Sequence, residues 1–325
     1  MNSDSNSSQL IKRQNILFEN KSGDITNYVN PIVKAMEYLK NSPDCFSNIV
    51  HSNASKNKII ERNYIISLAY SLGLLSNHCQ RINKIINGEV LKKIQCDNNI
   101  KDDICRIYNI SHPKSKTEIN NIMFIPDLLI HDSNESNLIQ EKFQHLVLEA
   151  KTTTNLSQYQ FAWDFCKLNL YQKYLNFRNA VYLIVNTDSE KIKNHLDAYL
   201  DKYPNTISEN GKLYFLIQKK ISSDIEIWEF KKNIIIMENE FGELKGKFSS
   251  VPDTTERDKL LNDMRSNLKM RIHAMSLNVD EYNLNSEKVE DLYKIDGDLK
   301  QLNSSKILTK IGEEYRNNHN ITNND

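Results

Sequence analysis

The spacing of apolar residues predicts a helix followed by two strands in the first half of the chain. Across residues 56–72, apolar side chains recur at about 100° per residue and form one stripe, with Glu61 at its centre. Two short apolar runs, residues 123–130 and residues 145–151, have the length and composition of β-strands. Residues 131–137 are polar and favour turns, so we expect the two strands to pair as antiparallel neighbours.

A second helix and further strands are predicted after these runs. Residues 158–177 carry apolar side chains on two sides, which is typical of a helix sandwiched between other layers. Residues 180–186 are strongly apolar and suit a buried strand parallel to residues 145–151. This succession predicts an α/β fold. Additional strands that extend the sheet are expected at residues 213–218, 225–230 and 233–237.

Helices are expected at both ends of the chain. Residues 24–39 predict one helix, and residues 255–277, 286–293 and 304–315, after Pro252, predict a C-terminal α-helical region. The expected organisation is a disordered arm (1–20), a helical segment (21–54), an α/β core (55–245), a helical region (246–316) and a disordered tail (317–325).

The candidate chemistry lies at the ends of the two predicted strands. Side chains alternate along a strand, so Glu149 and Lys151 project to one face while Ala150 projects to the other. Antiparallel pairing brings Asp127 beside Glu149. Two adjacent carboxylates repel one another unless a cation lies between them, and hard oxygen ligands suit Mg²⁺ with its retained waters.

Lys151 adds a positive charge next to these acids. Such a charge could stabilise a phosphate in its transition state or lower the pKa of an attacking water. We therefore expect a solvent-accessible site that combines a divalent metal with a lysine and hydrolyses phosphodiesters.

Pro126-Asp127 followed by Glu149-Ala150-Lys151 resembles the signature of the PD-(D/E)xK nuclease superfamily, over residues 55–190. The resemblance implies a restriction-endonuclease-like core, with Mg²⁺ as cofactor, for which Mn²⁺ can substitute, and DNA as partner. It also implies that Asp127 and Glu149 are catalytic metal ligands and that Lys151 is the catalytic lysine.

Two auxiliary residues are implied by the same resemblance. Glu61 matches an acid that a preceding helix brings to the metal, and Gln158 matches a glutamine that holds the water or the metal shell. An exposed position or an arginine partner would explain Glu61 equally well. Gln160 and Gln172 compete with Gln158, and an ordinary surface amide explains any one of them.

Charge composition limits where a nucleic acid could bind. The 42 basic and 42 acidic residues give no net attraction to a polyanion, so a binding site must be a local patch. Lys269, Arg265 and Arg271 lie on the polar side of the helix predicted at 255–277 and are spaced to contact phosphates. A solvated helix face is the commoner explanation of such charges.

Other features narrow the class of protein. The five cysteines include no Cys-x-x-Cys pair, which argues against a disulfide framework and against a zinc site. The first residues are polar, and no apolar run approaches the roughly 18 residues of a membrane span. These features predict a cytoplasmic protein without a membrane partner.

The sequence thus predicts a Mg²⁺-dependent DNA endonuclease of restriction or other defence type. A recombination or repair nuclease, of Holliday-junction resolvase or exonuclease type, is the nearest alternative. A non-catalytic nucleic-acid-binding protein with the same fold and an unrelated α/β interaction protein are alternatives from other classes. A double-strand cutter needs two sites, which a homodimer would supply.

Overall fold

The computed structural model describes residues 18–20, 28–41, 61–79, 85–88, 106, 125–132, 144–275 and 277–301. The chain forms two compact units: residues 20–230, called the α/β unit below, and residues 231–325 with residues 1–19, called the helical unit. The first described elements are β1 (Phe18–Asn20), α2 (Val29–Asn41), α4 (Glu61–Cys79), β2 (Ile85–Gly88), β3 (Leu128–His131) and β4 (Gln144–Lys151). They are followed by α7 (Gln158–Leu175), β5 (Asn179–Val185), α8 (Ser189–Lys202), η4 (Pro204–Thr206), β6 (Lys212–Gln218) and β7 (Glu226–Phe230).

The described strands form one mixed sheet in the order β1-β7-β6-β5-β4-β3-β2. The predicted antiparallel pairing is confirmed, because β3 runs antiparallel to β4 with Leu128 opposite Leu148. The predicted parallel pairing is confirmed as well, since β5 runs parallel to β4 with Tyr182 opposite Glu149. β2, which pairs with β3, has no counterpart among the strands expected from the sequence.

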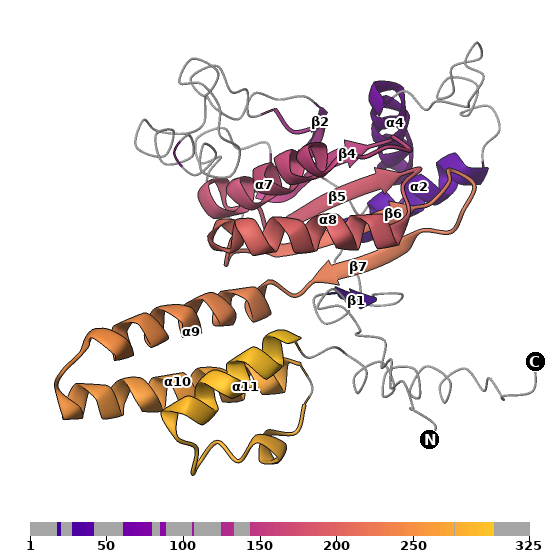
Figure 1. Cartoon of the computed structure of the whole chain (residues 1–325). Coiled ribbons are helices and arrows are strands. Elements are labelled where there is room, and N and C mark those ends of the chain that lie inside the picture. Colours follow the sequence, from indigo (N-terminus) through magenta and orange to yellow (C-terminus); the bar gives the residue numbers. More distant parts are fainter. Residues whose placement is uncertain are drawn as a thin grey trace, which may run out of the picture. The chain divides into compact units, whose positions relative to one another are not determined.

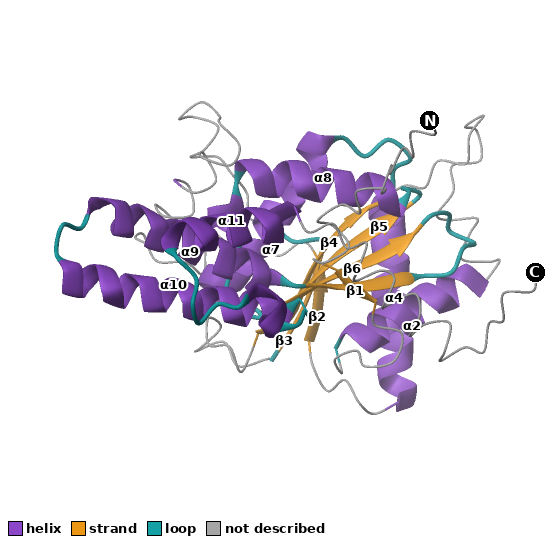
Figure 2. Ribbon diagram, turned by 60° about the horizontal axis from the view of Figure 1, so that its bottom comes forward, coloured by secondary structure: helices purple, strands orange, loops and turns teal. Residues whose placement is uncertain are grey.

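Helices cover both faces of this sheet (Figures 1 and 2). α2 and α4 lie on one face, and α7 and α8 lie on the other. Alternating side chains of the central strands, including Leu146, Leu148 and Ala150, join a buried cluster with α2 and α4. The opposite set faces α7, where the Phe161 ring packs against Tyr182 of β5 at a ring-centroid distance of 5.4 Å. The prediction that the helix after β4 is sandwiched is confirmed, because α7 is buried along most of its length.

The helical unit contains α9 (Lys232–Ser250), α10 (Thr254–Ala274), η5 (Val279–Tyr282) and α11 (Val289–Gln301). The predicted strand at residues 233–237 is wrong, because these residues form the first turns of α9. Three consecutive β-branched isoleucines suggested a strand, but the buried positions continue at helical spacing through Glu238 and Phe241 to Phe248. The helix predicted at 304–315 lies outside the described residues, as do the predicted disordered arm, except Phe18–Asn20, and the disordered tail.

Arg271 is buried inside the helical unit, where it forms ion pairs with two acids. Its side chain is fully buried, and its guanidinium contacts Asp296 at 2.6 Å and Glu238 at 3.4 Å. The prediction of Arg271 as a phosphate contact therefore fails in this structure, because α10 turns this residue towards α9 and α11 and away from solvent. A helix with several basic residues can direct one of them inwards when its neighbours supply acids.

Candidate functional site

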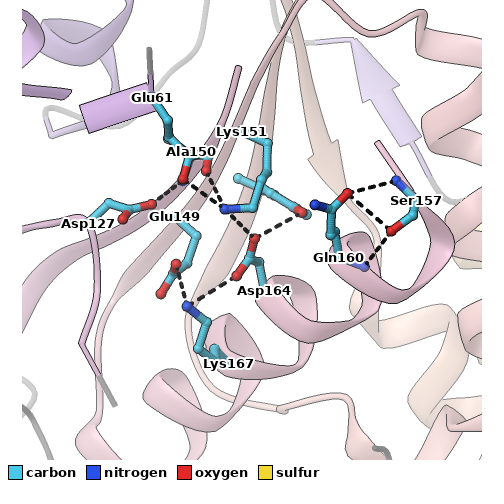
Figure 3. A network of polar contacts seen from close by, with 10 residues as sticks. Glu61, Asp127, Glu149, Ala150, Lys151, Ser157, Gln160, Asp164 and Lys167 are labelled. Atoms are coloured by element: carbon cyan, nitrogen blue, oxygen red, sulfur yellow. Dashed lines mark hydrogen bonds and ion pairs between the residues drawn. The ribbon is translucent and has the colours of Figure 1, made fainter. Parts of the chain in front are cut away.

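Six charged side chains meet at the end of β4 that carries Lys151 (Figure 3). They come from four parts of the α/β unit: the start of α4, the residue before β3, the end of β4 and the middle of α7. The acids are Glu61, Asp127, Glu149 and Asp164, and the bases are Lys151 and Lys167.

Asp127 lies next to β4, as the strand pairing predicted. It precedes β3 directly, and its Oδ2 accepts a hydrogen bond from the backbone N–H of Ala150 at 2.7 Å. Burial raises the pKa of Asp127 to about 6, although the Ala150 hydrogen bond and the Lys151 charge act in the opposite direction. This carboxylate therefore binds a proton or a cation more favourably than a carboxylate exposed to water does.

Glu149 is the most deeply buried acid of the site, with a side-chain exposure of 2%. Its Oε2 accepts a hydrogen bond from Lys167 Nζ at 2.6 Å. Its Oε1 is buried and has no hydrogen-bond partner within the described part of the chain. Burial raises the pKa of Glu149 well above its usual value, and Asp127 contributes in the same direction. A cation bound at this unpartnered oxygen would stabilise the folded protein, because it would compensate a buried polar atom that has no hydrogen bond.

Lys151 is held on three sides by oxygen atoms. Its Nζ lies 3.0 Å from Glu61 Oε1, 3.1 Å from the Ala150 carbonyl oxygen and 3.2 Å from Asp164 Oδ2. Burial lowers the pKa of Lys151, but the surrounding carboxylates outweigh it and leave the pKa above its usual value. Lys151 is therefore a fixed positive charge at neutral pH and cannot act as a general base in this arrangement.

Asp164 and Lys167 were not among the residues predicted for the site. They lie three residues apart on α7 and form an ion pair at 3.1 Å. Their signal in the sequence is a pair of opposite charges at helical spacing inside a helix that is apolar on two sides. A buried charge costs several kcal/mol unless it is paired, so this pair pointed to charged partners across the interface with the sheet.

The ion pairs form an alternating series of acids and bases. Glu61 contacts Lys151, Lys151 contacts Asp164, Asp164 contacts Lys167, and Lys167 contacts Glu149. With Asp127, the cluster contains four acids and two lysines, so its formal charge is −2 when all six groups are ionised. One divalent cation would neutralise it.

The structure brings Glu61 to the cluster, as predicted, whereas Gln158 contacts α8. Glu61 lies in the first turn of α4, and its Oε1 accepts a hydrogen bond from Lys151 Nζ at 3.0 Å. Its role as a metal ligand stays a prediction. Gln158 donates a hydrogen bond to the His195 carbonyl at 2.8 Å, so its side chain connects α7 to α8. Gln160 is part of the capping box of α7 with Ser157, and Gln172 donates to the Lys212 carbonyl at 2.8 Å. The hydrogen bonds of Gln158, Gln160 and Gln172 thus connect α7 to α8, to its own N-terminus and to β6.

The site is less exposed to solvent than the sequence predicts. Glu149 and Lys151 project to the same face of β4, as predicted, but α7 covers that face. Solvent reaches the cluster mainly at Glu61 and Lys151, whose side chains are 39% and 18% exposed. A substrate would therefore meet the ammonium of Lys151 and the half-buried Asp127 before Glu149.

The donor set is compatible with Mg²⁺, although it is small. Within the described residues, no group of three or more His, Cys, Asp or Glu side chains is arranged around one point. Mg²⁺ is commonly held by only one or two carboxylates, and water or substrate phosphate completes its shell. Asp127 and Glu149 offer two adjacent carboxylates, an unpartnered buried oxygen and an excess of negative charge, so these residues fit the ion.

The two other predicted nucleic-acid contacts lie in the helical unit. Arg265 Nη2 donates to the backbone carbonyl of Glu287, and Lys269 Nζ donates to Asn285 Oδ1 at 2.8 Å. Both residues therefore tie α10 to the segment before α11. Their contact with phosphate stays a prediction.

The chain was compared with protein-family models, with curated proteins and with solved structures, and none of the three comparisons gave a match. In the part of the chain that the structure describes, no helix has both the length and the apolar character needed to cross a bilayer. The function must therefore be argued from the site itself.

Proposed function

We propose that this protein is a Mg²⁺-dependent DNA endonuclease of the PD-(D/E)xK type, with a restriction or other defence role. The observation that carries the proposal is the meeting of Asp127, Glu149 and Lys151 at the ends of two paired strands, with Glu149 Oε1 buried and unpartnered. The order α4, β2, β3, β4, α7, β5 supports it, because a helix, antiparallel strands, a second helix and a parallel strand follow one another as the resemblance to a restriction-endonuclease-like core implies. Chance occurrence of the short motif alone would not supply this arrangement.

Asp127 and Glu149 are the residues that would hold the metal. A bound Mg²⁺ neutralises phosphate charge and makes a coordinated water more acidic. The chain itself contributes two carboxylates whose pKa values are raised by burial, so a cation beside them would compensate a charge that is poorly solvated. The half-buried position of Asp127 leaves this acid within reach of a phosphate that approaches Lys151.

Lys151 would bind a non-bridging oxygen of the phosphate and stabilise the charge that develops on it. All three of its ammonium hydrogens face oxygen atoms in this structure, so a phosphate must replace one contact. Glu61 is the most exposed of these partners, and its carboxylate is the group that the phosphate would displace. The persistent positive charge of Lys151 suits electrostatic stabilisation of the phosphate.

The test is cleavage of supercoiled plasmid by the purified full chain in Mg²⁺. We expect cleavage by the wild-type protein and a loss of at least 100-fold in Lys151→Ala, because one preorganised charge is worth about two to three orders of magnitude. Lys219→Ala is the matched control, since Lys219 is an exposed lysine paired with Asp188 outside the cluster. Its cleavage rate should equal that of the wild type.

Replacing Mg²⁺ by Ca²⁺ should retain DNA binding and stop cleavage. DNA binding without cleavage in Mg²⁺ would indicate a non-catalytic binding protein, and the absence of both would indicate an interaction protein of another kind. Equal cleavage without any divalent ion would contradict the proposed mechanism. Linear duplexes and four-way junctions, tested beside plasmid, separate a restriction role from a recombination or repair role.

A further inference from the structure

We propose that the Asp164–Lys167 pair of α7 is a positioning device that orients Lys151 and Glu149 for phosphodiester hydrolysis. The inference rests on the proposed function and goes beyond it, because neither residue belongs to the motif that suggested a nuclease. Asp164 and Lys167 are positioning residues in this scheme, since each acts through a residue of β4.

Asp164 connects the two lysines of the site (Figure 3). Its Oδ2 lies 3.2 Å from Lys151 Nζ, and its Oδ1 lies 3.1 Å from Lys167 Nζ. The Tyr182 hydroxyl, from β5, donates to the same Oδ2 at 3.5 Å. With a side-chain exposure of 3%, Asp164 has little freedom to rotate, so it fixes the direction from which Lys151 is held.

Lys167 determines which oxygen of Glu149 remains available. Its Nζ donates to Oε2 at 2.6 Å, and this contact leaves Oε1 as the oxygen without a partner. Lys167 is itself almost buried, with a side-chain exposure of 9%. A carboxylate anchored through one oxygen presents the other in a fixed direction, as hydrogen-bonded partners of metal-binding carboxylates do in general.

Each charged residue of the α7 pair contacts one charged residue of β4. Residues i and i+3 of a helix project to one side about 4.5 Å apart along the axis, and residues i and i+2 of a strand project to one side about 6.6 Å apart. The first residue of the helical pair, Asp164, faces the later strand residue, Lys151, and Lys167 faces Glu149. Two charged pairs thus connect one helix to one strand. The capping box at Ser157 and the burial of α7 make the helix a rigid support.

Stability alone is a weak explanation for this pair. Buried ion pairs can often be replaced by neutral residues of similar volume without loss of stability. Here the two charges lie against the two residues proposed to act on the phosphate and the metal. The removal of both also leaves the formal charge of the cluster unchanged, since one acid and one base are lost together. The effect of how Lys151 and Glu149 are positioned can therefore be tested separately from the effect of the net charge of the cluster.

The double variant Asp164→Asn with Lys167→Met tests the inference. It keeps the formal charge of the cluster at −2 and removes both members of the Asp164–Lys167 pair together, while Glu149 loses the contact with Lys167. We expect a circular-dichroism spectrum like that of the wild type, a kcat for plasmid cleavage at least 100-fold lower, and a KM for DNA within about threefold. We also expect Mg²⁺, titrated alone in a calorimeter, to bind at least tenfold more weakly, because Glu149 has lost its anchor.

The matched control applies the same substitutions to an exposed ion pair. Asp188→Asn with Lys219→Met removes a contact of 2.6 Å on the surface of the α/β unit. Asn can still accept the hydrogen bond with which Asp188 caps α8. This control should retain the wild-type kcat and the wild-type Mg²⁺ affinity.

A second variant covers the case in which the double variant does not fold. Asp164→Glu keeps every charge but moves the carboxylate outward by one methylene, and we expect a kcat at least tenfold lower with an unchanged KM. Wild-type kcat in Asp164→Glu, or wild-type kcat and Mg²⁺ affinity in the double variant, would overturn the inference while the wild-type protein still cleaves DNA. A wild-type protein that neither binds Mg²⁺ nor cleaves DNA would instead overturn the proposed function, and the inference with it.

Discussion

Replacing Asp127 by Asn should stabilise the protein at neutral pH and, under the proposed function, abolish DNA cleavage. The pKa of Asp127 rises from 3.8 to about 6 because burial disfavours its charge. One pKa unit corresponds to about 1.4 kcal/mol, so ionised Asp127 lowers the free energy of unfolding by about 3 kcal/mol above pH 6. Asn removes this cost and keeps an oxygen that can accept the hydrogen bond from Ala150.

The direction of the pH effect follows from proton binding. Between pH 3.8 and about 6 the folded protein holds the Asp127 proton more tightly than the unfolded chain does. The contribution of this group to stability is therefore fully present below pH 3.8 and is lost as the pH rises through 6. The difference between Asp127→Asn and the wild type should grow to about 3 kcal/mol over this range and stay constant above it.

Urea denaturation in EDTA at about pH 4 and at pH 8 measures this difference. Asp188→Asn is the matched control, because the Lys219 hydrogen bond lowers the pKa of Asp188, so the same substitution there should give no stabilisation. Added Mg²⁺ should raise the denaturation midpoint of the wild type, since it binds the folded state, and leave that of Asp127→Asn unchanged. A variant less stable than the wild type at pH 8 would refute the reasoning.

Three further substitutions test the scaffold by urea denaturation. Arg271→Met should cost about 3–5 kcal/mol, because it leaves the carboxylate of Asp296 buried without its principal partner; an unchanged midpoint would contradict the buried ion pair. Gly211→Ala should cost at least about 1 kcal/mol, since Gly211 has φ +65° and a Cβ there would lie 2.6 Å from the Phe177 carbonyl oxygen; wild-type stability would contradict this backbone conformation. Ser157→Ala should cost about 1 kcal/mol through loss of the α7 cap, whereas Ser157→Asp should cost much less.

The sequence predicts the part of the site that depends on local rules. Alternation along β4 places Glu149 and Lys151 on one face, and the antiparallel pairing of β3 with β4 places Asp127 next to them. Both rules act over a few residues or across one turn-rich connection. The positions of these three side chains can therefore be predicted from a single sequence. The helix and the parallel strand after β4 follow from apolar patterns of the same short range.

The contribution of α7 was not predictable in the same way. The apolar residues on both sides of this helix show that it is buried, but they do not show which side meets the end of β4. The partners of Asp164 and Lys167 depend on the rotation of α7 about its axis, which is a tertiary property. Arg271 illustrates the same limit, because a basic residue on a charge-rich helix is buried here only through acids that neighbouring helices supply.

The hydrogen bond from Ala150 to Asp127 ties the chemistry of the protein to the alignment of two strands. Shifting β3 against β4 by one residue would send every side chain of one strand to the opposite face of the sheet. Asp127 would then lose its amide donor, and the carboxylate of Glu149 would lose its neighbour. A misaligned chain would therefore lack the charged cluster as well as the native packing of the sheet, so the same strand alignment that stabilises the fold also assembles the proposed site.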